Sequence, residues 1–235
     1  MARNSHDEIL DRIGRRIAVG DLASGAVITL AGLETDYGVS RTVIRETIRV
    51  LESIGMVRSK RRVGVTIQPA ENWDTFDAHL IRWNITGPQR DAHLETLMEL
   101  RAGVEPMAAR LAALRASRAQ ADELHRLALE MEELGQHGLG ASEEYLADDI
   151  AFHSLLLTAS GNPMFQTLVN PVAATLRGRV DVGLMPAVPI EASLRGHVDI
   201  AQAIQARDAV AAAERTFHLL EAILREVVVE ERDEG

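Results

Sequence analysis

The sequence predicts a mainly α-helical protein in two parts: a small N-terminal unit of helices with a short hairpin, and a larger all-α bundle of six or seven helices. Charge separates the parts, because residues 1–68 contain 11 Lys and Arg against 8 Asp and Glu, whereas residues 69–235 contain 14 against 27. Beyond residue 73 apolar residues recur with a helical period, and strand-like alternation is missing. A chain of 235 residues, 46% hydrophobic, can bury a core in each part.

The composition excludes several classes of protein. Cysteine is absent, which rules out disulfides, thiolate nucleophiles and sulfur-based zinc sites and fits a reducing cytoplasm. No apolar run is long enough to span a membrane and the N-terminus lacks the apolar stretch of a signal peptide, so we expect a cytoplasmic protein without a membrane partner. The net charge of −10 argues against a protein that coats nucleic acid, but it leaves room for a local DNA-binding module.

Three helices are expected in the first 54 residues. Residues 5–19, a short stretch at 30–37 and residues 41–54 have apolar side chains at helical spacing, and glycines follow each of them. Ser40 is a favourable N-cap for the third helix. The tight connection between the second and third helices predicts a helix-turn-helix.

The third helix has a basic face. Arg41, Arg45 and Arg49 recur every four residues, opposite the apolar stripe of the same helix. A helix of this length suits the major groove of double-stranded DNA, where arginine reaches guanine acceptors and phosphates. We therefore predict that this is a recognition helix.

A basic hairpin is expected directly after the recognition helix. Two strand-like stretches, Met56–Ser59 and Val63–Ile67, flank the tip residues Lys60, Arg61 and Arg62, with Gly64 beside them. A basic hairpin in this position is typical of a wing, and its glycine permits close approach to a sugar-phosphate backbone. The sequence thus predicts a winged helix-turn-helix domain over residues 1–68.

The rest of the chain predicts a short linker, residues 69–73, and an all-α domain, residues 74–235. Glycine- and proline-containing stretches interrupt the helical pattern. Helices are expected near residues 74–85, 91–115, 118–137, 142–159, 163–182, 190–206 and 208–231.

Four residues of the bundle form a candidate metal site. Asp149 and His153 are four residues apart and share a helix face, His197 lies on an apolar stripe, and His218 lies beside Phe217 at the edge of another. Three imidazoles and a carboxylate would suit a divalent ion, with zinc foremost and Ni, Mn or Fe as alternatives. The alternative interpretation is that these are ordinary core histidines, because an Asp-x-x-x-His pair arises readily by chance.

Arg101 is the second notable residue of the bundle. It falls on an apolar stripe with Met98 and Val104, where a guanidinium needs a partner. It binds either the carboxylate of an effector or an internal acid such as Glu105. Arg177 and Arg195 are weaker candidates for the same role.

The N-terminal part resembles the DNA-binding domain of GntR-type transcriptional regulators. The resemblance rests on the stretches 38–46 and 51–57 and on the wing glycine. It implies that Arg41, Arg45 and Gly64 contact operator DNA. We expect the neighbouring Thr42 and Arg49 and the basic wing to contact the DNA as well. Ala31 and Gly32 depart from the pattern, because many members carry a basic residue early in the second helix.

The C-terminal part resembles the FCD effector domain of the FadR branch of this family. Many FCD domains bind a divalent metal through an Asp-x-x-Phe-His stretch, which Asp149–His153 matches, and through two later histidines, which His197 and His218 match. FCD proteins often carry an arginine in the context of Arg101 and bind small organic acids. The residues around Trp73 and Arg82-Trp83 are similar to sugar-acid regulators of the gluconate or galactonate type.

These observations favour a repressor that binds an inverted-repeat operator as a homodimer and is released by a small carboxylic acid. The alternative is a metal-dependent enzyme that uses the Asp/His residues for chemistry, although no nucleophile motif or phosphate-binding loop accompanies them. The alanine-rich stretches Ala108–Ala116 and Ala209–Ala213 would form either the dimer interface or intramolecular contacts.

Overall fold

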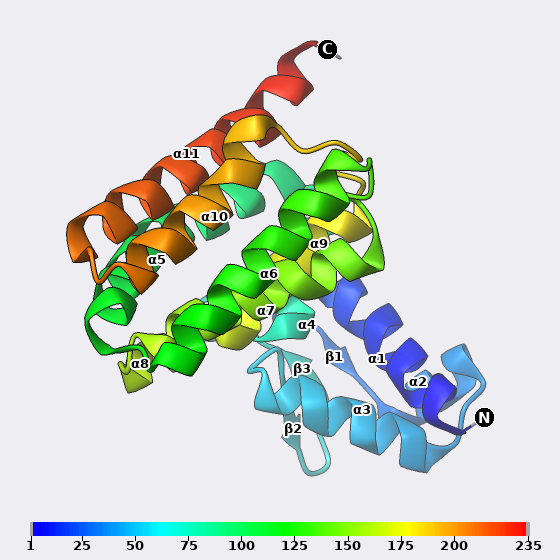
Figure 1. Ribbon diagram of the computed structural model, residues 1–235. Coiled ribbons are helices and arrows are strands. Elements are labelled where there is room, and N and C mark those ends of the chain that lie inside the picture. Colours follow the sequence, from blue (N-terminus) through cyan, green and yellow to red (C-terminus); the bar gives the residue numbers. More distant parts are fainter. Residues whose placement is uncertain (1, 234–235) are drawn as a thin grey trace. The chain divides into compact units, whose positions relative to one another are not determined.

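The computed structural model describes residues 2–233 of the chain (Figure 1). It contains two compact units, of which the first ends at Arg90 and the second begins at Asp91. The elements of the first unit are α1 Ala2–Ala18, β1 Val27–Ile28, α2 Leu30–Tyr37, α3 Arg41–Ser53, β2 Val57–Lys60, β3 Gly64–Ile67, the 3₁₀ turn η1 Ala70–Asn72, and α4 Ala78–Ile85. Those of the second are α5 Arg90–Arg115, α6 Arg118–Gln136, α7 Glu143–Ala159, α8 Pro163–Gln166, α9 Val169–Asp181, α10 Glu191–Gln205 and α11 Ala209–Asp233. The predicted fold class is confirmed.

Side-chain caps determine where the helices of the helix-turn-helix begin. The Thr29 hydroxyl accepts a hydrogen bond from the Gly32 amide at the start of α2, and Ser40 accepts one from Val43 at the start of α3. Between them Gly38 ends α2 in the left-handed conformation, with φ of 65°. These local signals explain why the sequence located both helices closely.

The hairpin after α3 belongs to a three-stranded antiparallel sheet with the order β1-β3-β2. Strand β1 is only two residues long, too short for an alternating pattern, and the sequence did not predict it. Gly64 has a φ of 122°, and a Cβ on it would lie 2.7 Å from the carbonyl oxygen of Ile28. The glycine is therefore required for the close approach of β1 to the wing.

The segment that follows the wing packs on the first unit. The Asp74 amide donates to the Ile54 carbonyl over 2.7 Å, and α4 lies against α1. The buried Trp83 anchors α4, because its indole N–H donates to Asp11 over 2.8 Å and its ring lies where a Cβ on Gly14 would be. The first compact unit consequently extends to Arg90 and includes the segment that follows the wing.

The second unit is a bundle in which α6 packs on α7 and on α10, α7 packs on α9, and α10 packs on α11 (Figure 1). The helix predicted at 163–182 is two helices, α8 and α9. Pro171 lacks the N–H that would bond back to residue 167, which favours the break. Ala108, Ala109, Ala112, Ala113 and Ala212 are fully buried within this one chain, so these alanines make intramolecular contacts. No described helix is both long and apolar enough to cross a membrane.

Candidate functional site

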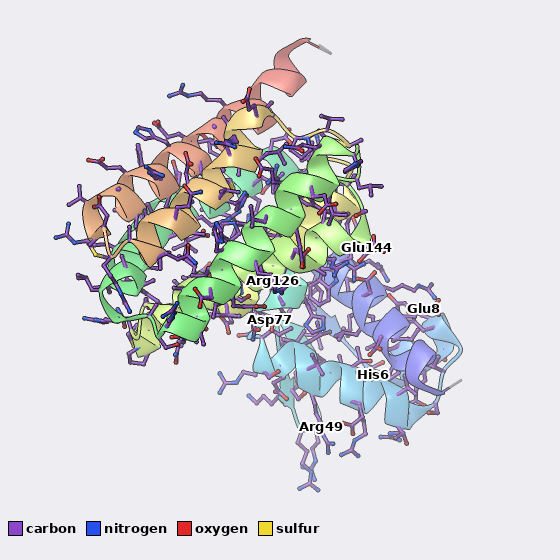
Figure 2. All side chains as sticks on the ribbon, viewed as in Figure 1. His6, Glu8, Arg49, Asp77, Arg126 and Glu144 are labelled. Atoms are coloured by element: carbon purple, nitrogen blue, oxygen red, sulfur yellow. The ribbon has the colours of Figure 1, made fainter. Side chains whose placement is uncertain are left out.

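The predicted recognition helix presents its basic face to solvent. Burial of Ile44, Ile48 and Leu51 orients α3, so that Arg41, Thr42, Arg45 and Arg49 are exposed on the other side. Figure 2 labels Arg49, which forms an ion pair of 2.6 Å with Glu46 on the same helix. Such a pair between exposed groups is weak and easily exchanged for a phosphate.

The wing adds three exposed cations, Lys60, Arg61 and Arg62. Arg62 has a left-handed backbone with φ of 65°, at the turn between β2 and β3. Within the described residues, neither the side chains of these three cations nor that of Arg45 form an ion pair or hydrogen bond with the rest of the chain. We call the exposed side chains of Arg41, Thr42, Arg45, Arg49, Lys60, Arg61 and Arg62 the basic surface. Its cations remain available to an external polyanion.

Three of the four predicted metal ligands come together inside the second unit. Asp149 and His153 of α7 and His197 of α10 are all buried and present one ligand atom each to a common point. Asp149 Oδ1 lies 3.2 Å from His153 Nε2 and 3.6 Å from His197 Nε2, and the two Nε2 atoms are 3.4 Å apart. We call these three residues the ligand triad.

The spacing of the ligand triad fits a small divalent ion. A tetrahedral ion with bonds of about 2.0–2.2 Å holds its ligand atoms about 3.3–3.6 Å apart, which matches the observed separations. The other nitrogen of each imidazole lies close to an oxygen atom. The Nδ1–H of His197 donates to the Ser193 carbonyl over 2.9 Å, and His153 Nδ1 lies 2.6 Å from Glu105 Oε2. Such partners leave Nε2 as the metal-binding nitrogen.

His218 does not join the triad, contrary to the prediction. Its side chain is 73% exposed, and its nearest charged partner is Glu221 at 3.9 Å on the same helix. The buried face of α11 carries Thr216, Leu219 and Leu220 instead. Apolar residues lie on both sides of His218 in the sequence, so the phase of the helix was ambiguous there, and the packing against α10 decides it.

Arg101 is buried beside the triad and is paired with an internal acid. Its Nε lies 2.5 Å from Glu105 Oε1, one turn further along α5, and its Nη2 lies 3.2 Å from His153 Nε2. The internal salt bridge that the sequence left open is therefore present. We call Arg101, Glu105 and the ligand triad the buried charge cluster.

The carboxylates of this cluster are ionised. Burial raises the pKa of Glu105, but Arg101 and His153 outweigh that effect and hold the pKa at about 2. Burial likewise raises the pKa of Asp149, yet its contacts with His153 and His197 bring it well below its usual range. Both groups thus carry negative charge at neutral pH, as metal coordination requires.

A small cavity adjoins the triad, with Asp149, His197 and Arg179 on its wall. Its volume is about 10 Å³, room for about one water molecule. Arg179 was missed in the sequence, although it follows Val172, Thr175 and Leu176 on the buried stripe of α9, the pattern that singled out Arg101.

The weaker arginine candidates do not reach this cavity. Arg177 pairs with Glu143 at 2.6 Å, and Arg195 pairs with Glu132 at 3.3 Å, both with substantially exposed guanidinium groups.

Comparison with known families agrees with both units. The model of the bacterial regulatory proteins of the gntR family matches residues 5–67, and the FCD domain model matches residues 96–222. The chain belongs to the GntR family and carries an FCD domain. Regulators of this family bind operator DNA and small-molecule effectors, and FCD domains often bind a metal.

Curated relatives of this GntR-family protein are transcriptional regulators rather than enzymes. It is 28% identical to the HTH-type transcriptional regulator YieP of Escherichia coli (strain K12), over 69% of this chain and 70% of that protein. It is 27% identical to the galactonate operon transcriptional repressor of the same organism, over 75% and 76% of the two chains.

Two solved structures share the fold of this GntR-family protein. Lar, which controls expression of the Listeria monocytogenes agr system, matches with a TM-score of 0.64 at 16% identity, over 95% of this chain and 96% of that one. Streptococcus agalactiae GntR matches with a TM-score of 0.53 at 24% identity, over 94% and 99%.

Proposed function

We propose that this GntR-family regulator is a repressor that binds an inverted-repeat operator as a homodimer, in the cytoplasm, and is released by a small carboxylic acid. The observation that carries the DNA-binding part is the basic surface, in which a helix with arginines on successive turns is followed by a wing whose cationic side chains have no partner among the described residues. The repressor assignment is supported by the likeness to the galactonate operon repressor. A two-fold dimer with two recognition helices would match an inverted repeat.

Arg45→Ala tests this proposal. The operator is first selected with the wild-type protein from a random duplex library, and affinity is then measured by fluorescence anisotropy. Loss of one base-reading arginine should weaken binding by about 5- to 150-fold. Arg118→Ala, which removes an exposed arginine from the second unit, is the matched control and should leave affinity unchanged. Unchanged affinity in Arg45→Ala would contradict the assignment, and selected sites without inverted symmetry would contradict the dimer.

We propose that the effector that releases the DNA binds in a metal-containing pocket at the ligand triad. Asp149, His153 and His197 would hold the ion, which when bound supplies a Lewis-acidic position for an oxygen of the effector. Asp149 and Glu105 contribute two negative charges and Arg101 one positive charge, so a divalent ion leaves the cluster with an excess of one positive charge. Arg179 adds another on the cavity wall. An anionic ligand is what this electrostatic environment favours.

We propose that the anion is a small hydroxy acid of the sugar-acid type, held between the metal and Arg101 or Arg179. The cavity is too small for such a molecule as it stands. Met185, Pro186 and Pro189 of the connection between α9 and α10 close it, and the Ala187 carbonyl accepts a hydrogen bond of 2.8 Å from the Gly140 amide. This connection must therefore move when the acid enters. To act as an inducer, the acid must also favour the arrangement that does not bind DNA.

Thermal unfolding with a panel of galactonate and other small hydroxy and keto acids tests the pocket. An acid present at about 100 times its Kd should add roughly 2.7 kcal/mol of stability. This shift should disappear after treatment with a chelator and in the variant with Asp149→Ala and His153→Ala. A shift that survives both changes would place the acid elsewhere, and metal retained in the double variant would contradict the triad.

A further inference from the structure

Within the buried charge cluster, Glu105 contacts both Arg101 and a residue of the ligand triad, His153. Its side chain is fully buried on α5. Oxygen Oε1 accepts from Arg101 Nε at 2.5 Å, and Oε2 lies 2.6 Å from His153 Nδ1 and 3.4 Å from Arg101 Nη2. One carboxylate therefore holds a metal ligand with one oxygen and the guanidinium mainly with the other.

We propose that Glu105 is a positioning residue that links the metal to the effector arginine. This inference rests on the proposed function, because it concerns the same pocket. A carboxylate oxygen accepts hydrogen bonds and a guanidinium only donates them. Glu105 Oε2 at 2.6 Å from Nδ1 and Arg101 Nη2 at 3.2 Å from Nε2 therefore both favour the tautomer of neutral His153 with its proton on Nδ1. The lone pair of His153 is then on Nε2, which faces Asp149 Oδ1 at 3.2 Å. Glu105 thus selects the tautomer that can bind a metal.

The position of Arg101 gives Glu105 its second task. Arg101 Nη2 lies 3.2 Å from His153 Nε2 and uses the lone pair that a metal would take. The lone pair cannot serve both, so metal binding ends this contact. The bond from Arg101 Nε to Glu105 does not involve Nε2 and persists. The guanidinium consequently stays beside the ligand triad, and the Nη2 group that leaves His153 can turn to a carboxylate of the ligand.

Glu105→Gln tests whether Glu105 positions both His153 and Arg101 or only balances the charge of Arg101. Glutamine has nearly the same shape but a single acceptor oxygen, so it can accept from Arg101 or from His153 and not from both. Affinity for Zn²⁺ is measured by competition with a chromogenic chelator, well below the unfolding temperature. We expect it to fall by about 10- to 100-fold, the usual effect of losing the partner of a metal-bound histidine. Glu99→Gln, an exposed change on the same helix, is the control and should retain wild-type affinity.

A second variant covers the possibility that Glu105→Gln folds poorly. Arg101→Met with Glu105→Leu removes the whole ion pair, and apolar replacement of a buried pair is often well tolerated. If Glu105 positions His153, Zn²⁺ affinity falls in this folded variant too, and the visible absorption of the Co²⁺-loaded form changes. A merely structural counter-ion would leave both unchanged.

The outcomes distinguish this inference from the proposed function. Wild-type Zn²⁺ affinity in both folded variants would overturn the role of Glu105 alone. Failure of the wild-type protein to bind Zn²⁺ or Co²⁺ would overturn the metal-containing pocket and this inference with it.

Discussion

The two units of this protein treat charge in opposite ways. In the first unit the cations of the basic surface face solvent, and Arg45 and the wing cations have no side-chain partner within the described residues. In the second unit Arg101, Glu105 and Asp149 are buried and contact one another or the two histidines. Exposed cations remain hydrated and stay available to a polyanion, whereas buried charges lose their hydration and are stable only when paired.

This difference determines what each unit can respond to. The basic surface can neutralise phosphates along a duplex without any change inside its own core. The buried charge cluster admits a new ion or ligand only by replacing an existing contact, such as that between Arg101 Nη2 and His153 Nε2. The first arrangement suits binding to a large partner, and the second suits sensing of a small one.

The largest effect on the free energy of unfolding is expected from removing one partner of the buried pair of Arg101 and Glu105. Glu105→Ala leaves the guanidinium of Arg101 buried without its paired carboxylate, which should lower the free energy of unfolding by about 3–5 kcal/mol. Arg45→Ala, at an exposed position, should change it by no more than about 0.5 kcal/mol. Urea denaturation followed by circular dichroism measures both. Equal effects of the two substitutions would remove the contrast between the units.

A smaller effect is expected at the junction of α1 and α4. A Cβ on Gly14 would lie 2.1 Å from the Trp83 ring, so Gly14→Ala should cost about 1–3 kcal/mol through overpacking. Gly103→Ala is the matched control, because no atom lies within 4 Å of its Cβ position on α5, and it should stabilise by about 0.5–1 kcal/mol. The same denaturation measurement applies. A neutral Gly14→Ala would show that α4 is not anchored through Trp83.

The smallest effect concerns the salt dependence of DNA binding. Removal of one phosphate-contacting cation by Lys60→Ala should reduce the slope of log K against log salt concentration by about 0.9, with a modest loss of affinity on all duplexes. Affinities at several salt concentrations give the slope. The variant with Asp149→Ala and His153→Ala should keep the wild-type slope. A changed slope in the double variant, or an unchanged slope in Lys60→Ala, would contradict the assignment of DNA binding to the first unit alone.

Much of this architecture could be predicted because its signals are local. Ser40 caps α3 with its own side chain, and Arg41, Arg45 and Arg49 share a face because a helix has a fixed period. The bounds of α5, α6 and α7 follow from apolar spacing and from caps such as Ser117 and Ser142. None of these features depends on which other helix lies nearby.

Other features arise only when elements meet. Strand β1 forms because it pairs with β3 of the wing. Helix α4 belongs to the first unit because Trp83 donates a hydrogen bond to Asp11 and its ring packs against Gly14. Neither fact is visible in the residues of β1 or α4 taken alone. Short segments gain their structure from the surface that receives them.

The candidate site shows the same division. Helical spacing alone places Asp149 and His153 on one face of a helix and shows that Arg101 interrupts an apolar stripe. The packing of the helices brings His197 to them, leaves His218 facing solvent, and places Glu105 and Arg179 beside the triad. Periodicity fixes the relative angles of side chains within one helix, whereas the packing of neighbouring helices determines which side chains point into a common core.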